Sequence, residues 1–214
     1  MVTPDHIDFT QCPAKILHLG LLGVHKILDA PWNDEPSGWV EVLKRAKAQG
    51  LHTNIEMVSI DPETNRRLAL PCLEYLDSLI INDYEAGCLC EFNTVSNGKA
   101  DPDACMQAAE QLLHSGAMDF VIVHFPGGAA AVNKSGEKHL LPSVDVEPDH
   151  IKSSVGAGDA FAAGVLYGVY TSRPLKHCVQ LGHAIAAASL RSETTVGAIK
   201  PVDECLQMAA THLE

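Results

Sequence analysis

Short apolar runs alternate with amphipathic stretches along this chain. Runs that end at Gly, Asp or Asn predict strands over residues 16–19, 55–60, 79–81 and 120–124, and a turn at 133–136 joins two more at 129–132 and 139–141. Stretches with helical periodicity, capping residues or a first-turn proline predict helices over 37–50, 101–114, 174–190 and 201–213. Strands that alternate with helices of this length predict an α/β fold with a mostly parallel sheet covered on both faces.

Residues 152–168 carry the strongest candidate chemistry. Their first half is small and flexible, and residues 160–170 have the pattern of a buried helix rich in Ala and Gly. Gly156, Ala157 and Gly158 therefore lie where a loop becomes a helix N-terminus, whose free N–H groups and positive dipole favour a phosphate. Asp159 follows in the first turn. A carboxylate beside an anion site is what phosphoryl transfer to a hydroxyl requires, although an ordinary helix start would use the same residues.

Ser-Ser-Val-Gly-Ala-Gly-Asp-Ala-Phe-Ala-Ala-Gly, residues 153–164, closely resembles the signature of the ribokinase-like (PfkB) family of carbohydrate and nucleoside kinases. The resemblance implies a three-layer α/β/α sandwich and transfer of the ATP γ-phosphate to a hydroxyl of a sugar or sugar-like acceptor. It implies that Asp159 is the catalytic base, and that the backbone of Gly156, Ala157 and Gly158 forms the anion hole. A nucleoside as the acceptor stays open within this class.

Asn82 and Glu85 follow the apolar run 79–81 and would share one face of a first helical turn. As a free-standing pattern, this spacing favours a helix cap with reciprocal hydrogen bonds. Oxygen ligands at a strand end also suit Mg²⁺, which keeps several of its waters. The same family carries Asn-x-x-Glu at this place. The resemblance therefore implies that Asn82 and Glu85 support a magnesium and phosphate network and hold Mg²⁺ through water. The capping role and the metal role are compatible.

His124-Phe125-Pro126-Gly127-Gly128-Ala129 forms a strand followed by a glycine turn. It is similar to the family's ATP-contacting loop, Thr-x-Gly-x-x-Gly, which makes His124, Gly127 and Gly128 candidate ATP contacts. The sequence departs from that loop, because His124 replaces Thr and Pro126 replaces the first Gly. Proline has no N–H and a fixed φ. A plain hairpin turn is therefore an equal alternative.

Composition restricts the partners. A net charge of −12 argues against a nucleic-acid or anionic membrane surface, and no apolar run has the length of a membrane span. The N-terminus lacks the features of a secretory signal, so we expect a cytoplasmic protein with seven reduced cysteines. Cys88 and Cys90 do not match a Cys-x-x-Cys zinc pattern.

The 214 residues predict a single nucleotide-binding and catalytic domain, residues 1–214. Ribokinase-like enzymes usually carry a further N-terminal portion with the first strands, a β lid and an early sugar-binding Asp, and we find no counterpart before Ile16. Three interpretations follow: a fragment of a sugar kinase, a natural lidless kinase, or a non-catalytic nucleotide-binding or regulatory module. An apolar surface exposed where the lid would dock would favour a homo-oligomer.

Overall fold

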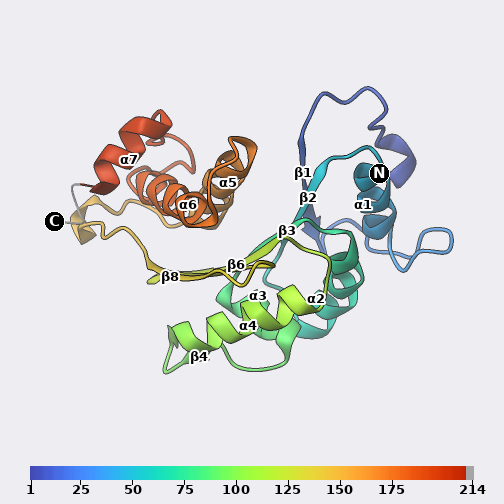
Figure 1. The fold of residues 1–214 in the computed structure, drawn as a ribbon, viewed down its shortest axis with the longest axis horizontal. Helices are drawn as coiled ribbons and strands as arrows, with labels where there is room; N and C mark the ends of the chain where they lie inside the picture. The colour runs from blue at the N-terminus through green and yellow to red at the C-terminus, as the bar shows by residue number, and fades with distance from the viewer. Residues whose placement is uncertain (211–214) are drawn as a thin grey trace. The chain divides into compact units, whose positions relative to one another are not determined.

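The computed structural model describes residues 1–210 (Figure 1). Its strands are β1 (Ile16–Leu22), β2 (His52–Met57), β3 (Ser78–Asn82), β4 (Val95–Ser96), β5 (Lys99–Ala100), β6 (Phe120–Phe125), β7 (Gly128–Asn133) and β8 (Lys138–Pro142). Its α-helices are α1 (Gly38–Ala48), α2 (Pro62–Ala69), α3 (Asp83–Cys90), α4 (Pro102–His114), α5 (Ala157–Tyr170), α6 (Leu175–Ser189) and α7 (Val202–Ala210). Short 3₁₀ turns occupy Pro4–His6, Leu70–Tyr75 and Pro148–His150.

The chain divides into two compact units. Unit 1 comprises Met1–Val123 and Val132–Lys138, and unit 2 comprises His124–Ala131 and His139–Glu214. In unit 1, β1 and β2 pair in parallel with α1 as the connection between them, which is the pairing that an α/β chain predicts. The strands β3, β6, β7 and β8 follow one another in a second sheet, and the boundary between the units falls within its β6–β7 hairpin.

Helix α1 confirms the amphipathic pattern in the sequence. The Ser37 hydroxyl caps its first turn by accepting the Val40 N–H, as the predicted start at residue 37 requires. Trp39, Val42 and Leu43 are fully buried on one face. Helix α4 likewise begins after the predicted cap, where the Asp101 carboxylate accepts two backbone N–H groups.

The sequence did not predict helix α2 or the hairpin of β4 and β5. The strand expected over 55–60 ends at Met57, and the residues that follow it form α2, because Asp61 caps the Thr64 N–H and Pro62 occupies the first helical position. Asp61 and Pro62 follow the predicted strand directly, and from the sequence they indicated only its end. The small antiparallel hairpin β4–β5 was also missed, because its strands are only two residues long each.

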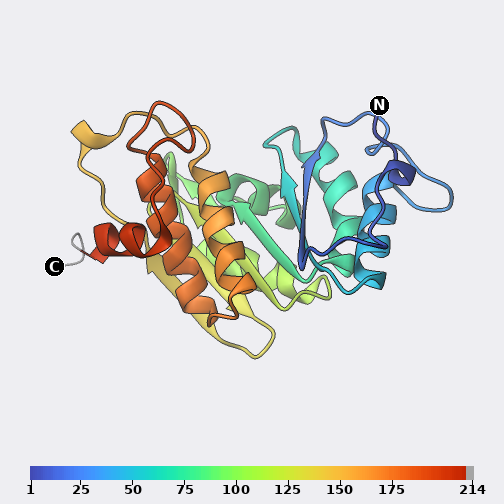
Figure 2. The same cartoon turned by 90° about the horizontal axis from the view of Figure 1, so that it is seen from above.

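In unit 2, α5 and α6 run side by side, and both views show them in contact (Figures 1 and 2). Glycines make this approach close. A Cβ on Gly164 would stand 2.8 Å from the Gly182 Cα and 2.8 Å from the Leu181 carbonyl oxygen. The Ala- and Gly-rich pattern of 160–170 therefore serves helix packing, and it fixes the axis along which the N-terminus of α5 is presented.

We expect Gly164→Ala to destabilise the protein by about 1–3 kcal/mol, because its methyl group would meet backbone atoms that cannot rotate away. The result is diagnostic since Gly→Ala within a helix otherwise gains about 1 kcal/mol. Urea unfolding followed by circular dichroism measures the difference. Ala163→Ser, on the exposed side of the same helix, is the matched control and should change stability by less than about 0.5 kcal/mol. A Gly164→Ala protein as stable as the original would contradict this close packing.

The C-terminal helices and the cysteines agree with the expectations from the sequence. Helix α6 lies within the predicted 174–190, and α7 confirms the start of the predicted 201–213 helix, whose last residues lie outside the described part. All seven cysteines are free and six of them are buried. Within residues 1–210, none of the helices combines the length and the apolar character that a membrane crossing needs.

Candidate active site

The N-terminus of α5 presents Asp159 to solvent beside a glycine cap. Gly156 is the cap residue, with φ +79°, a left-handed conformation that favours glycine. Among the described residues no side chain caps this helix, and the Ala157 N–H turns back to the Ser154 carbonyl at 3.2 Å. The N–H groups of Gly158 and Asp159 are therefore the first-turn donors with no acceptor inside the helix. This end of α5 therefore leaves backbone donors open beside an exposed carboxylate, an arrangement that would favour an anion.

Two other segments of unit 2 hold this helix end in place. The Lys152 N–H donates to the Leu190 carbonyl at 2.8 Å, which ties the preceding loop to the end of α6. A Cβ on Gly156 would stand 2.8 Å from Cγ2 of Thr195 and 3.8 Å from Oδ2 of Asp159. The sequence alone predicts no contact for Thr195. Thr195 therefore borders the cap that Asp159 also faces.

The rings of His124, Phe161 and His183 form a row of neighbouring rings beside the N-terminus of α5. The His124 and Phe161 ring centroids are 5.0 Å apart, and those of Phe161 and His183 are 5.1 Å apart in an edge-on arrangement. A Cβ on Gly158 would lie 3.3 Å from Cε1 of His124, so the imidazole packs directly against the first turn of α5. A methyl group at residue 158 would be tight against this ring, which would have to move by a few tenths of an ångström to make room.

Both histidines of this row are held in their neutral form. Burial lowers the pKa of His124 to about 4, which the neighbouring His183 reinforces and the Asp159 carboxylate opposes. Burial also lowers the pKa of His183 to about 4, against a hydrogen bond to the Leu141 carbonyl. The Nε2 of His183 is buried and has no hydrogen-bond partner within residues 1–210, so Nδ1 carries the proton that Leu141 accepts.

We expect the protein to lose stability as the pH falls below about 6.5. Between about pH 6.5 and pH 4 these histidines bind protons in the unfolded chain but stay neutral in the folded protein. The stability from this source is therefore complete above the unfolded-state pKa and declines as the pH falls toward the folded-state pKa of about 4. Between pH 7 and pH 5 the loss should be about 2 kcal/mol for each histidine. Urea unfolding at several pH values measures it. His124→Asn with His183→Asn should flatten the curve, whereas His177→Asn on the exposed side of α6 should not; an unchanged slope in the double variant would refute this origin.

Asn82 and Glu85 form a closed hydrogen-bonded arrangement at the end of β3. The Asn82 Oδ1 accepts the Glu85 N–H at 2.8 Å, and Glu85 Oε2 accepts the Asn82 N–H at 3.1 Å. The Ser59 hydroxyl donates to Glu85 Oε1 at 3.2 Å and accepts from the Asn82 amide at 3.2 Å. The capping box predicted as one of the two alternatives is therefore present. A role in a metal network is compatible with it and stays a prediction.

The donor set around Glu85 fits a hydrated cation. Glu85 is only 5% exposed, and burial raises its pKa, with the hydrogen bonds from Asn82 and Ser59 opposing the rise. Burial also raises the pKa of the adjacent Asp83. A nearby Mg²⁺ would relieve that cost, and each carboxylate oxygen keeps a second lone pair. Within residues 1–210 no cluster of three or more metal-binding side chains occurs, so these carboxylates would act through metal-bound water.

The turn between β6 and β7 separates the three residues predicted to contact ATP. His124 faces the row of rings, and Gly127 is exposed at the turn, where its carbonyl accepts the Ser143 N–H at 3.2 Å. Gly128 is buried, and a Cβ on it would stand 2.5 Å from the Leu141 carbonyl oxygen. Gly128 is therefore required for the close pairing of β7 with β8. The hairpin-turn alternative describes these residues, and an ATP contact stays a prediction.

The structure thus groups the predicted residues into two sets. In unit 2 it brings Gly156, Gly158 and Asp159 together with His124, and in unit 1 it brings Asn82 together with Glu85. It adds neighbours that the sequence did not reveal, namely Ser59, Phe161, His183 and Thr195. Phe161 lies in the signature 153–164 and His183 in the helix predicted over 174–190, but nothing in their spacing indicates a ring contact between two helices.

Comparison with known proteins places these features in a family. Residues 18–202 match the model of the pfkB family carbohydrate kinases. The chain is 37% identical over 86 residues to a cytidine kinase of Thermococcus kodakarensis, covering 34% of this chain and 31% of that protein. It is 34% identical over 110 residues to the 1-phosphofructokinase of Escherichia coli K12, covering 51% of this chain and 33% of that protein.

A solved structure extends the likeness to the fold. Arabidopsis thaliana ribokinase, complexed with ribose and ATP, superposes with a TM-score of 0.66 at 16% identity, over 81% of this chain and 52% of the ribokinase. The predicted ribokinase-like α/β fold is confirmed. The matches span about a third of the curated relatives and about half of the ribokinase. From its residues, its fold and the match over 18–202, the chain belongs to the pfkB family of carbohydrate kinases.

Proposed function

We propose that this protein is an ATP-dependent phosphotransferase that moves the γ-phosphate to a hydroxyl of a sugar or sugar-like acceptor, with residues 1–214 acting as one nucleotide-binding and catalytic domain. The observation that supports it most directly is the end of α5, where an uncapped first turn and the exposed Asp159 carboxylate stand side by side. Any helix start leaves N–H groups free, but a side-chain cap commonly satisfies them; this helix has no such cap, which supports a phosphate at this end next to a base.

Each group at this helix end has a role in the proposed reaction. Asp159 accepts the proton of the acceptor hydroxyl, whose oxygen then forms a bond to the γ-phosphorus while the bond to the ADP oxygen breaks. The backbone of Gly156, Ala157 and Gly158 forms the anion hole that stabilises the charge on the transferred group. Because Ala157 N–H donates to Ser154, we assign the donation itself to the Gly158 and Asp159 N–H groups. His124 keeps the first turn in position as an uncharged ring.

Asn82 and Glu85 would support the magnesium and phosphate network, with Glu85 accepting hydrogen bonds from metal-bound water. Bound Mg²⁺ would neutralise phosphate charge. For the nucleotide itself, Gly127 is the exposed position of the β6–β7 turn at which an ATP could approach the backbone, whereas Gly128 would act by holding β7 against β8. The two kinase relatives and the ribokinase complexed with ATP support ATP as the donor.

Two acceptor classes compete. The 1-phosphofructokinase and ribokinase relatives favour a sugar or sugar phosphate, and the cytidine kinase, with its higher identity over a shorter stretch, favours a nucleoside. A sugar ring and a nucleoside both offer a primary hydroxyl to Asp159. The nucleoside adds a base, which needs a planar apolar site.

The deciding experiment measures ADP formation with ATP and Mg²⁺ against pentoses, hexoses, hexose phosphates and nucleosides. We expect one acceptor class to raise ADP formation at least about tenfold above the rate without acceptor, and EDTA to abolish it. ATP binding by calorimetry with no stimulation by any acceptor would instead favour the non-catalytic nucleotide-binding alternative. Absence of both ATP binding and turnover would refute the proposal.

A further inference from the structure

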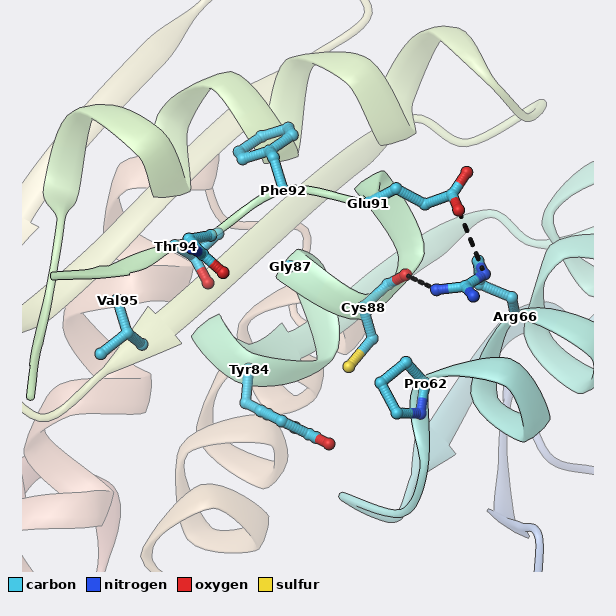
Figure 3. A pocket seen from close by; sticks show the side chains of 10 residues that line it. Pro62, Arg66, Tyr84, Gly87, Cys88, Glu91, Phe92, Thr94 and Val95 are labelled. Atoms are coloured by element: carbon cyan, nitrogen blue, oxygen red, sulfur yellow. Dashed lines mark hydrogen bonds and ion pairs between the residues drawn. The ribbon is translucent and has the colours of Figure 1, made fainter.

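Unit 1 contains a cavity of about 300 Å³ that none of the roles above uses (Figure 3). It lies between the start of α2, one face of α3 and the loop that follows α3. Tyr84, Gly87, Cys88 and Glu91 are spaced so that they share that face of α3. The volume is at the lower end of the range of small-molecule sites, enough for one ring with a charged group.

One side of the cavity is apolar. Pro62 and Tyr84 contribute ring surface to it, and Figure 3 shows the Cys88 sulfur directed toward them. The Tyr84 hydroxyl donates to the Ile60 carbonyl at 3.0 Å, which fixes that ring in place. Gly87 lets the loop approach α3, because a Cβ there would stand 2.9 Å from the Phe92 carbonyl oxygen. Contacts with the backbone therefore fix the Tyr84 ring and the loop after α3 in place without a ligand.

The other side of the cavity carries a cation whose charge is poorly compensated. Among the described residues that line the cavity, Arg66 is the sole cation. Its Nη1 donates to the Cys88 carbonyl at 3.0 Å, so the guanidinium is held in position by a neutral acceptor. Its ion pair with Glu91 is long, at 3.7 Å from Nε to Oε1, and the Glu91 side chain is 71% exposed. An exposed pair of this length contributes little, so an incoming anion can replace Glu91.

We propose that this cavity binds a small aromatic anion, with a carboxylate or phosphate group on the Arg66 guanidinium and its ring against Pro62 and Tyr84. A guanidinium fork matches either anionic group with two parallel hydrogen bonds, and the ring surface selects a planar apolar body. In a protein of net charge −12, such a ligand needs a local cation of this kind. The site does not depend on the proposed kinase activity.

Titration calorimetry with benzoate tests the site, with acetate as the anion without a ring and benzyl alcohol as the ring without a charge. We expect saturable binding of one benzoate, at least about tenfold tighter than either control compound. Arg66→Gln should weaken benzoate binding at least about tenfold, and Glu91→Gln should tighten it severalfold because it removes the competing carboxylate. Phenyl phosphate should respond to the two variants in the same direction.

Arg67→Gln is the matched control, because Arg67 lies on the same helix, donates to the Asp29 carbonyl and does not line the cavity. Its affinity for benzoate should match that of the unmodified protein. Equal binding of benzyl alcohol and benzoate, equal loss in the Arg66 and Arg67 variants, or no saturable binding would each overturn the proposal. Circular dichroism checks that Arg66→Gln is folded; if it is not, an unchanged affinity in the exposed Glu91→Gln variant overturns the proposal by itself.

Discussion

Asp159→Asn is expected to lower kcat by about 10²–10⁴-fold while leaving the KM for ATP within about twofold. Asparagine has the shape of aspartate and keeps the hydrogen-bonding oxygen of a first-turn residue, but it cannot take a proton from a hydroxyl. The Asp159 side chain is exposed and faces the Gly156 cap, so no buried partner is lost. Steady-state ADP formation with the acceptor that the screen of sugars and nucleosides selects, together with calorimetry of ATP binding, measures the two effects separately.

Asp203→Asn is the matched control for that experiment. Asp203 is also an exposed first-turn acid of a helix in unit 2, so both substitutions remove the same interaction with a helix dipole, worth about 0.3–1 kcal/mol. Only the Asp159 variant should lose turnover. A loss of ATP binding as large as the loss of turnover would mean that Asp159 serves the helix end or the nucleotide and not the hydroxyl proton.

The parts of the fold that could be predicted are those with local signals. Helix α4 follows Asp101 and Pro102, which together fix the cap and the first helical position, and its bounds agree with the expectation at both ends. Helix α2 carries the same signal in Asp61 and Pro62, yet Leu68 and Ala69 are the only apolar residues after that proline, and no helix was predicted there. The capping Asp and first-turn Pro therefore indicate a helix start even where few apolar residues follow them.

In the candidate site too, the features with a local sequence signal could be predicted and those formed by tertiary packing could not. The glycine cap at Gly156 and the first-turn position of Asp159 follow from residue type and spacing within a few positions. The ring row does not, because His124, Phe161 and His183 come from one strand and two helices and meet only through tertiary packing. Burial that shifts a histidine pKa depends on those neighbours, so no local pattern could have predicted it.

Trp39→Ala should cost about 3–5 kcal/mol of folding free energy, the largest loss of stability that we expect from a single substitution. Trp39 is fully buried in α1, and its removal leaves a cavity of the largest kind in unit 1. It also leaves Asp29 without the indole N–H that it accepts at 2.7 Å. That carboxylate further accepts the N–H groups of Gly23 and His25, so the loop after β1 should loosen together with the core.

The indole N–H can be separated from the ring volume with two substitutions to phenylalanine. Trp39→Phe keeps most of the packing and loses the bond to Asp29, so it should cost about 1–3 kcal/mol. Trp32→Phe is the matched control, because Nε1 of Trp32 is buried with no hydrogen-bond partner within residues 1–210, and its removal should be neutral or stabilising. Urea unfolding followed by circular dichroism compares the three variants. Removing the indole N–H of Trp39 leaves an Asp29 oxygen without its donor, whereas removing that of Trp32 leaves no acceptor unpaired. Equal losses of stability in the two phenylalanine variants would therefore show that the bond to Asp29 does not hold this loop.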